Sequence, residues 1–215
     1  MEVHVFKQVE GVSEKIIACS KKEFLEKGYT DASLRTIAAE AGTTTGSIYS
    51  RYGDKEGLFL AIVEPVAETF IGKFRAIQEK FHGMDSTRQQ TELDDYTRSG
   101  MIELIEYMYD NLEEFKLLVN SSYGTKYQNF VENLVNIETD YTYKYMKTIG
   151  VQIKKGSPLT KDFMHIMNKA LFESFFEVIR HEMSKEEAIE YINWLEKYHS
   201  AGWEHIYSEC SYTGC

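Results

Sequence analysis

The stretch SLRTIAAEAGTTTGSIY, residues 33–49, carries the signals of two short helices joined by a tight turn. Ser33 is expected to cap the first helix, because a serine oxygen accepts a hydrogen bond from the free N–H groups of a first turn. Leu34, Ile37 and Ala38 then share an apolar face, and Gly42 suits the left-handed conformation that ends many helices. The second helix has room for about two turns, so it must pack on other parts of the chain.

A longer helix is predicted over residues 13–27, with Ser13 as its N-cap and Gly28 at its end. Its side chains at three- and four-residue steps form one stripe: Ile16, Ile17, Ser20, Phe24 and Leu25. Two short helices with a glycine-containing turn, packed on a preceding helix, form a helix-turn-helix whose last helix enters the major groove of DNA. The sequence therefore predicts a DNA-binding domain over residues 1–56.

The side chains of residues 43–55 fit contact with DNA. Hydroxyl groups and a glycine allow polar contacts and close approach of the backbone, while a tyrosine and an arginine reach further. Lys55 follows Asp54, the expected N-cap of the next helix, where a cation and free N–H groups would together hold a phosphate. The candidate DNA-binding residues are Arg35, Thr44, Thr45, Gly46, Ser47, Tyr49, Arg51 and Lys55.

A plainer interpretation treats each of these residues separately. Tyr49 and Ile48 would then be core residues, residues 44–47 an ordinary loop and Lys55 a solvated charge. The capping serine, the two glycines and the spacing together favour DNA binding over this alternative. Ile48 is nevertheless expected to lie in the core, facing the first helix.

The run from Ile16 to Phe59, about a fifth of the chain, resembles the DNA-binding domain of the TetR family. The motifs that carry the resemblance are SLRTIAAEAG at 33–42, TGSIY at 45–49, and then Tyr52, Lys55 and Leu58-Phe59. The resemblance implies that Arg35 touches DNA from the second helix, that Thr45, Gly46, Ser47 and Tyr49 belong to the recognition helix, and that Lys55 holds a phosphate. Thr43 and Gly53 depart from the family pattern, which has an apolar residue, commonly Val, at the first position and commonly Pro or Lys at the second.

Charge is unevenly distributed along the 215 residues. The formal net charge is -10, but residues 1–56 hold eight basic and nine acidic side chains, a balance of -1, and the other -9 falls on residues 57–215. A nearly neutral module can still bind DNA when its cations are well placed. The three cysteines are scattered, and neither a signal peptide nor a transmembrane run is evident, so we expect a cytoplasmic protein without a membrane partner.

Residues 57–215 are predicted to form a helical effector-binding and dimerisation domain, which makes the whole chain all-α. Expected helices cover residues 54–80, 98–121, 125–149, 161–183 and 184–208, with surface loops at 82–90 and 150–161. Pro65 lies inside the first of these and is expected to kink or break it near residues 63–64.

The last two helices carry an apolar stripe wider than one partner helix covers, which indicates burial against a second copy. The TetR resemblance implies the same arrangement, a homodimer joined by a four-helix interface that presents two recognition helices to a palindromic operator in double-stranded DNA. The expected interface residues are Phe163, Met167, Leu171, Phe175, Ile192, Leu195, Tyr198 and Ile206.

Many aromatic side chains lie between these helices, and they fit either ordinary packing or the wall of a pocket for a small-molecule effector. The candidate ligand-binding residues are Tyr107, Tyr123, Tyr127, His165, Asn168 and Phe172. Glu103 and Glu106 would favour a cationic effector if buried, although a solvated helix face explains them equally well. The identity of the effector does not follow from these residues.

No catalytic or cofactor motif is recognisable in the sequence. His199, His205 and Cys210 are too few and too poorly spaced to predict a metal site, and glycine-rich phosphate loops and nucleophile elbows are missing. We therefore expect no cofactor, no metal and no enzymatic activity. The favoured function is a ligand-responsive DNA-binding repressor; the alternative is a helical dimer that binds a small molecule or protein, with weak or no DNA binding.

Overall fold

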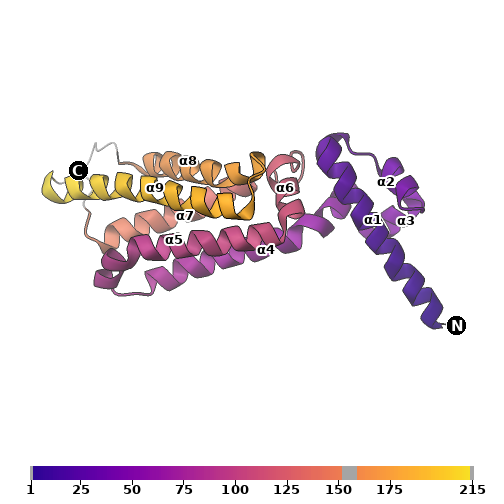
Figure 1. Ribbon diagram of the computed structural model, residues 1–215, viewed down its shortest axis with the longest axis horizontal. Coiled ribbons are helices and arrows are strands. Elements are labelled where there is room, and N and C mark those ends of the chain that lie inside the picture. The colour runs from indigo at the N-terminus through magenta and orange to yellow at the C-terminus, as the bar shows by residue number, and fades with distance from the viewer. Residues whose placement is uncertain (1, 152–158, 214–215) are drawn as a thin grey trace. The chain divides into compact units, whose positions relative to one another are not determined.

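A computed structural model describes the backbone of residues 2–151 and 159–213, and the side chains of 11–151 and 159–209. In these residues the protein is entirely helical and has no strand, as the all-α prediction required (Figure 1). The helices are α1 (Glu2–Asp31), α2 (Leu34–Glu40), α3 (Thr45–Tyr52), α4 (Lys55–His82), α5 (Ser86–Asp110), α6 (Leu112–Asn120), α7 (Phe130–Thr148), α8 (Lys161–Arg180) and α9 (Lys185–Thr213). No helix in the described ranges is both long and apolar enough to cross a membrane.

The chain forms two compact units. Unit 1 consists of Met1–Thr69 and Asn111–Asn129, and unit 2 of Phe70–Asp110 and Phe130–Cys215. Helix α4 contributes residues to both, and α6 belongs to unit 1 because it packs on α1. These units are defined by packing; the functional boundary after residue 56 stays a prediction.

Helix α1 begins earlier than the sequence predicted. It runs from Glu2, so Ser13 lies inside it, and the expected N-cap at Ser13 is wrong. The preceding residues contain no proline to stop a helix. Gly28 does interrupt the helical backbone as expected, with φ 72° and ψ 167°.

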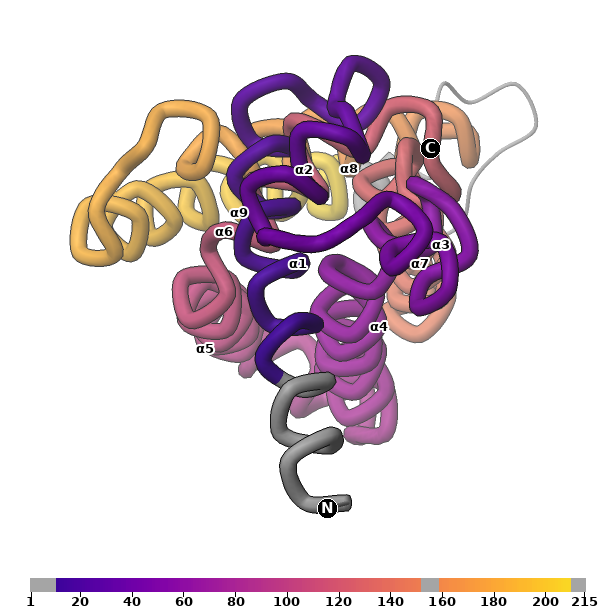
Figure 2. Tube along the Cα trace, turned by 90° about the vertical axis from the view of Figure 1, so that its right-hand side faces the viewer, coloured from indigo at the N-terminus to yellow at the C-terminus, as the bar shows by residue number. Residues whose placement is uncertain are grey.

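The core of unit 1 joins its helices through large apolar side chains. Ile16, Phe24, Ile37, Ile48 and Phe59 have no exposed surface. The rings of Phe24 and Phe59 meet edge to face at 5.2 Å between centroids. Helix α2 packs against both α1 and α3, and Figure 2 shows these three helices near one another. The expected burial of Ile48 is confirmed.

Helix α4 continues through Pro65, so the proline does not break it near residues 63–64. The Thr69 hydroxyl donates to the Pro65 carbonyl at 2.7 Å. The loop expected at 82–90 is also largely wrong, because α5 already begins at Ser86. Asp85 starts that helix by accepting hydrogen bonds from the N–H groups of Thr87 and Arg88, both at 3.1 Å.

The helix predicted over 98–121 is divided at Asn111, whose φ of -132° and ψ of 40° are not helical. Helix α7 starts at Phe130 rather than at 125, because residues 122–129 form turns. The Ser122 hydroxyl donates to the carbonyls of Leu118 and Tyr127, which holds these turns together. Side-chain hydrogen bonds to the backbone thus compete with the helix here.

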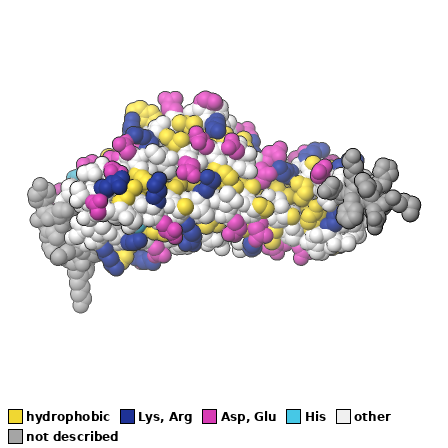
Figure 3. Space-filling model, turned by 90° about the horizontal axis from the view of Figure 1, so that it is seen from below, with side chains coloured by type: hydrophobic (Ala, Val, Ile, Leu, Met, Phe, Trp, Pro, Cys, Tyr) yellow, Lys and Arg dark blue, Asp and Glu magenta, His cyan; other side chains and the backbone are white. Residues whose placement is uncertain are grey.

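Unit 2 is a bundle in which α7 packs on α8 and both α5 and α8 pack on α9 (Figure 1). Its centre is rich in phenylalanine: Phe70 contacts Phe130 and Phe176, and Phe74 contacts Phe172 edge to face at 5.5 Å. Helices α8 and α9 agree with the predicted pair except that α8 ends at Arg180 and α9 extends to Thr213. On the face drawn in Figure 3, acidic and basic side chains are interspersed among hydrophobic ones.

Candidate functional site

Helices α2 and α3 form the turn that the sequence predicted. Ser33 caps α2 by accepting from the Thr36 N–H at 3.4 Å, and Thr44 caps α3 by accepting from the Ser47 N–H at 3.1 Å. Gly42 has a φ of 66°, and Thr43 N–H donates to the Ala38 carbonyl at 2.9 Å. These bonds end α2 and start α3 within four residues, which gives the turn a defined angle.

One face of α3 is buried in unit 1 and the other is exposed to solvent. Ile48 points into unit 1, whereas the candidate DNA-binding residues Thr44, Gly46 and Tyr49 are exposed, Tyr49 by 53%. Thr45 and Ser47 are half-buried, and Arg35 is exposed on α2. The candidates from the sequence therefore cluster on α3 and beside it.

Arg51 is engaged within unit 1. Its guanidinium donates to the Ser13 hydroxyl at 3.3 Å, to the Ser47 carbonyl at 3.2 Å and to the Ser47 hydroxyl. The arginine remains exposed, so it holds the end of α3 to α1 while keeping its charge at the surface.

Lys55 has a structural position that the sequence did not predict. Its ammonium donates to the carbonyls of Thr30 at 2.8 Å and Ala32 at 3.2 Å, and lies 4.8 Å from the centroid of the Tyr29 ring. The ammonium thus supplies hydrogen-bond donors to the carbonyls of Thr30 and Ala32, which follow the break at Gly28. Asp54 caps α4 as expected, by accepting from the Gly57 N–H at 2.7 Å.

A buried glutamate also supports the turn. Glu23, only 8% exposed, accepts a hydrogen bond from the Ser33 N–H at 2.9 Å. This bond fixes the start of α2 to α1. The signal in the sequence was an acidic residue next to the apolar Phe24, which is easily read as a surface position.

Unit 2 encloses a cavity of about 150 Å³ lined by α4, α5, α7, α8 and α9. Most of its wall is aromatic or aliphatic, including Phe81, Tyr145, Phe172 and Trp203. The lining suits an organic molecule, and a cavity of this volume has room for one about as large as benzene.

A chain of polar groups crosses one wall of the cavity. Gln78 Nε2 donates to Glu138 Oε2 at 2.6 Å, and the Thr142 hydroxyl donates to Glu138 Oε1 at 3.4 Å. Asn168 Nδ2 then donates to the hydroxyls of Thr142 at 3.1 Å and Thr139 at 3.4 Å. Burial raises the pKa of Glu138 to about 7, because the charged form loses solvation.

Other ionisable groups line the same cavity. Glu196 is 3% exposed and accepts from the Ser200 hydroxyl at 2.8 Å. Burial, with a contribution from Lys144, lowers the pKa of His82 to about 4, and burial also lowers the pKa of His199. Burial and the nearby Tyr145 and Glu138 raise the pKa of Tyr207. Both histidines are therefore neutral near pH 7.

Only two of the six ligand-binding candidates line this cavity, Asn168 and Phe172. Tyr123 is 80% exposed and Tyr127 donates to Glu68 at 2.8 Å, both within unit 1. Tyr107 lies beneath the Lys73 ammonium, and His165 Nε2 is 3.0 Å from Glu132.

The two acidic candidates for a cationic effector are exposed, Glu103 and Glu106. The condition under which they would favour such an effector, burial, is therefore not met. The glutamates that line the cavity are Glu138, which is half-buried, and Glu196, which is buried; neither was among the sequence candidates.

The expected dimer residues separate into two groups. Phe175 and Ile192 are 2% and 0% exposed within one chain, whereas Leu171 is half-buried and, like Phe175, lines the cavity. Phe163, Met167, Leu195 and Ile206 are half-buried, and Tyr198 is 76% exposed. The exposed apolar side chains on α8 and α9 also include Ile166 and Trp194, which were not among the expected interface residues.

Residues 16–62 match the family model for bacterial regulatory proteins of the tetR family. The transcriptional regulator HbdR of Aromatoleum sp. (strain CIB) is 36% identical over 64 residues, which are 30% of this chain and 28% of the relative. The transcriptional repressor AcnR of Corynebacterium glutamicum is 37% identical over 49 residues, 23% of this chain and 26% of the relative. The matched segments thus span less than a third of these two relatives.

Solved structures extend the likeness to the whole fold. A TetR-like transcriptional regulator from Rhodococcus sp. RHA1 superposes with a TM-score of 0.57 at 16% identity, covering 89% of this chain and 96% of that one. NalD, the secondary repressor of the MexAB-OprM multidrug efflux pump in Pseudomonas aeruginosa, gives a TM-score of 0.52 at 17% identity, covering 90% and 97%. Residues 16–62 thus match the tetR family of bacterial regulatory proteins, and the fold of the chain is similar to that of TetR-like regulators.

Proposed function

We propose that this protein is a DNA-binding transcriptional repressor that is released from its operator by a small-molecule effector. The observation that carries the proposal is the exposed face of α3, where Thr44, Gly46 and Tyr49 project from a helix whose other side is fixed by Ile48. The relatives named above are regulators and repressors, which supports this function over an enzymatic one. A role on operator DNA corresponds to a cytoplasmic location.

The proposed effector site is the cavity of unit 2. Helix α4 supports a link between effector and DNA, because Phe74, Gln78 and Phe81 line the cavity while Lys55 and Phe59, on the same helix, belong to unit 1. An effector that binds better to one position of α4 shifts the population toward that position. In the proposed repressor mechanism, the protein with α4 in the position favoured by the effector binds DNA less tightly.

DNA binding is tested by electrophoretic mobility shift with DNA from upstream of the coding sequence, at about 50 and 200 mM salt, since phosphate contacts weaken as salt rises. Tyr49→Ala is expected to weaken binding about tenfold or more if Tyr49 contacts the operator. Tyr123→Ala is the matched control, because Tyr123 is also an exposed tyrosine of unit 1. Equal binding by wild type and Tyr49→Ala would reject the proposed recognition face. A chain that binds no DNA at either salt would favour the alternative, a helical binding module.

The proposed homodimer uses the outer faces of α8 and α9. Ile166, Trp194 and Tyr198 are 58%, 65% and 76% exposed, which is unusual for side chains of this size. Tyr198→Asp is expected to convert dimer to monomer in light scattering coupled to size exclusion, whereas Tyr123→Asp leaves the mass unchanged. A dimer that survives Tyr198→Asp, Trp194→Asp and their combination would place the interface elsewhere.

A further inference from the structure

The cavity of unit 2 has an unusual charge balance. Its described lining includes two carboxylates, Glu138 on α7 and Glu196 on α9, and neither lysine nor arginine. Buried carboxylates are normally paired with a cation or a metal, because an unpaired buried charge is costly. The described residues contain no cluster of three or more metal-ligating side chains, so a metal ion does not fill this need.

The hydrogen bonds to these carboxylates come from neutral groups. Glu138 accepts from the Gln78 amide and the Thr142 hydroxyl, and Glu196 accepts from the Ser200 hydroxyl. Such bonds hold each carboxylate in place without supplying a positive charge. The raised pKa of Glu138 is the consequence, since burial acts on it and no cation offsets the effect.

The walls around the carboxylates are aromatic. Trp203 and Tyr207 stack at 5.5 Å between centroids with an interplanar angle of 21°, and both line the cavity with Phe81 and Phe172. Aromatic faces attract cations through their quadrupole, and groups of them recognise quaternary ammonium ions. The same faces accommodate an apolar ring.

We propose that the cavity binds an organic cation, an aromatic compound bearing a quaternary or protonated amine, with Glu138 and Glu196 as its counter-ions. An anion is disfavoured by the two carboxylates, and a purely apolar ligand would leave both carboxylates buried without a counter-charge. The ligand class follows from the cavity alone; its role as effector rests on the proposed function.

The test uses two probes of the same shape, phenyltrimethylammonium and its neutral carbon analogue tert-butylbenzene, titrated into the full chain by isothermal calorimetry near pH 8. The cation is expected to bind at least about tenfold more tightly than the neutral probe, because only the cation pairs with buried carboxylates. Glu138→Gln and Glu196→Gln are each expected to weaken the cation about tenfold or more and to change the neutral probe by less than about twofold.

The matched control is Glu103→Gln, which removes one negative charge from the exposed surface of α5 in the same unit. It is expected to change neither probe by more than about twofold, because solvent screens surface charge. Equal affinity of both probes for wild type, or cation binding that is unchanged in both cavity variants, would overturn the proposal.

The effector role is separated from the ligand class by repeating the mobility shift with phenyltrimethylammonium. Tight binding of the cation by a chain that never binds DNA would retain the ligand class and reject the repressor. A chain that binds its operator but shows no preference for the cation would reject the ligand class alone.

Discussion

Units 1 and 2 use their buried polar groups differently. In unit 1 the buried Glu23 accepts from the Ser33 N–H, and the half-buried Lys55 donates to two carbonyls. In unit 2 the carboxylates of Glu138 and Glu196 meet only neutral donors at a cavity. The first pattern fixes the helices of unit 1 to one another, and the second is the pattern on which the proposed ligand site depends.

The comparison predicts that substitutions where the helices of unit 1 meet lower its stability strongly. Gly57, in the first turn of α4, is the sharpest case. A Cβ added at Gly57 would lie 1.9 Å from the Tyr52 carbonyl oxygen, which belongs to the backbone and cannot turn aside as the end of a flexible side chain would. Gly57→Ala is expected to lower the free energy of unfolding by about 3 kcal/mol or more and to abolish DNA binding. Urea unfolding followed by circular dichroism measures the first effect.

Gly72→Ala on the same helix is the control. Gly72 is exposed and a Cβ there meets nothing within 4 Å, so alanine is expected to stabilise α4 by about 0.5 to 1 kcal/mol. Similar unfolding curves for the two variants would show that the close approach at Gly57 is relieved without cost.

Glu138→Gln is expected to act in the opposite direction, by stabilising unit 2 at alkaline pH. The folded pKa of about 7 lies above the ordinary value of 4.5, so the folded state binds more protons between these values and stability falls as pH rises through this window. Gln78 from α4 and Thr142 from α7 hydrogen-bond to Glu138, and Tyr207 from α9 interacts with its charge. The other titratable groups that line the cavity include His82, His199 and Glu196, and burial lowers the pKa of both histidines.

The variant should therefore exceed wild type by about 1 to 3 kcal/mol at pH 8 and match it near pH 4.5. Thermal melts across this pH range measure the difference. A stability difference that is the same at both pH values would show that the carboxylate is not desolvated in the folded protein.

Lys55→Met separates a structural role of Lys55 from a role in phosphate binding. Methionine keeps the aliphatic stem but removes the ammonium from the carbonyls of Thr30 and Ala32, so unfolding is expected to become easier by about 1 to 2 kcal/mol. Lys15→Ala, an exposed position on α1, is the control. If Lys55→Met loses DNA affinity at full stability, the lysine serves DNA and not the fold.

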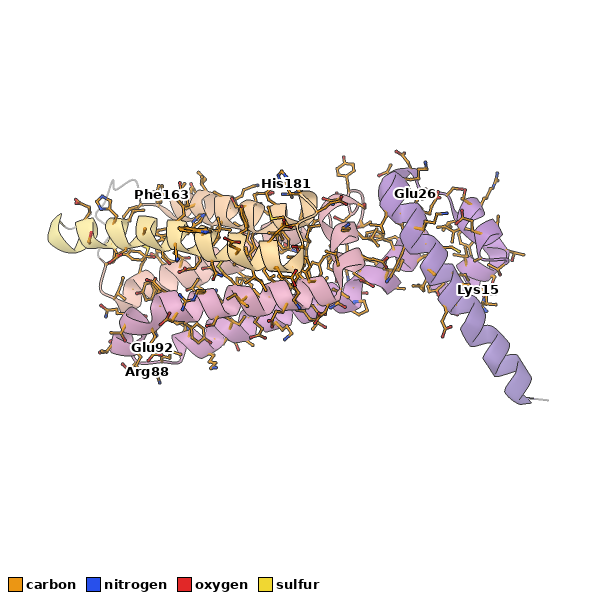
Figure 4. All side chains as sticks on the ribbon, viewed as in Figure 1. Lys15, Glu26, Arg88, Glu92, Phe163 and His181 are labelled. Carbon is orange, nitrogen blue, oxygen red and sulfur yellow. The ribbon has the colours of Figure 1, made fainter. Side chains whose placement is uncertain are left out.

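The smallest effect is expected at the surface of unit 2. Arg88 and Glu92 form an exposed i,i+4 pair at 2.9 Å near the start of α5 (Figure 4). Arg88→Ala is expected to leave stability unchanged within the error of a thermal melt, because solvent and salt screen such pairs. A loss of stability as large as that of Lys55→Met would mean that an exposed ion pair contributes as much to folding as the half-buried Lys55, contrary to the comparison of the two units.

Local signals in the sequence were sufficient for the helix-turn-helix. Ser33, Gly42 and the apolar Ile37 and Ile48 each act within a few residues, so capping, termination and burial were predictable. The all-α class followed equally from helical periodicity. Local signals misled at Ser13, which has the chemistry of a cap but lies within α1, and at residues 86–90, whose polar composition suggested a loop.

The sequence by itself determined the all-α class, the turn between α2 and α3 and the exposed side of α3, because these depend on neighbours in the chain. Only the tertiary structure decided that Lys55 binds carbonyls 23 and 25 positions away, and that Phe175 is buried beside a cavity. It also decided that Glu138 and Glu196 line a cavity, whereas Glu103 and Glu106 are exposed. The physical reason is that the environment of a charge depends on which helices pack around it, and residues far apart in the sequence set that packing.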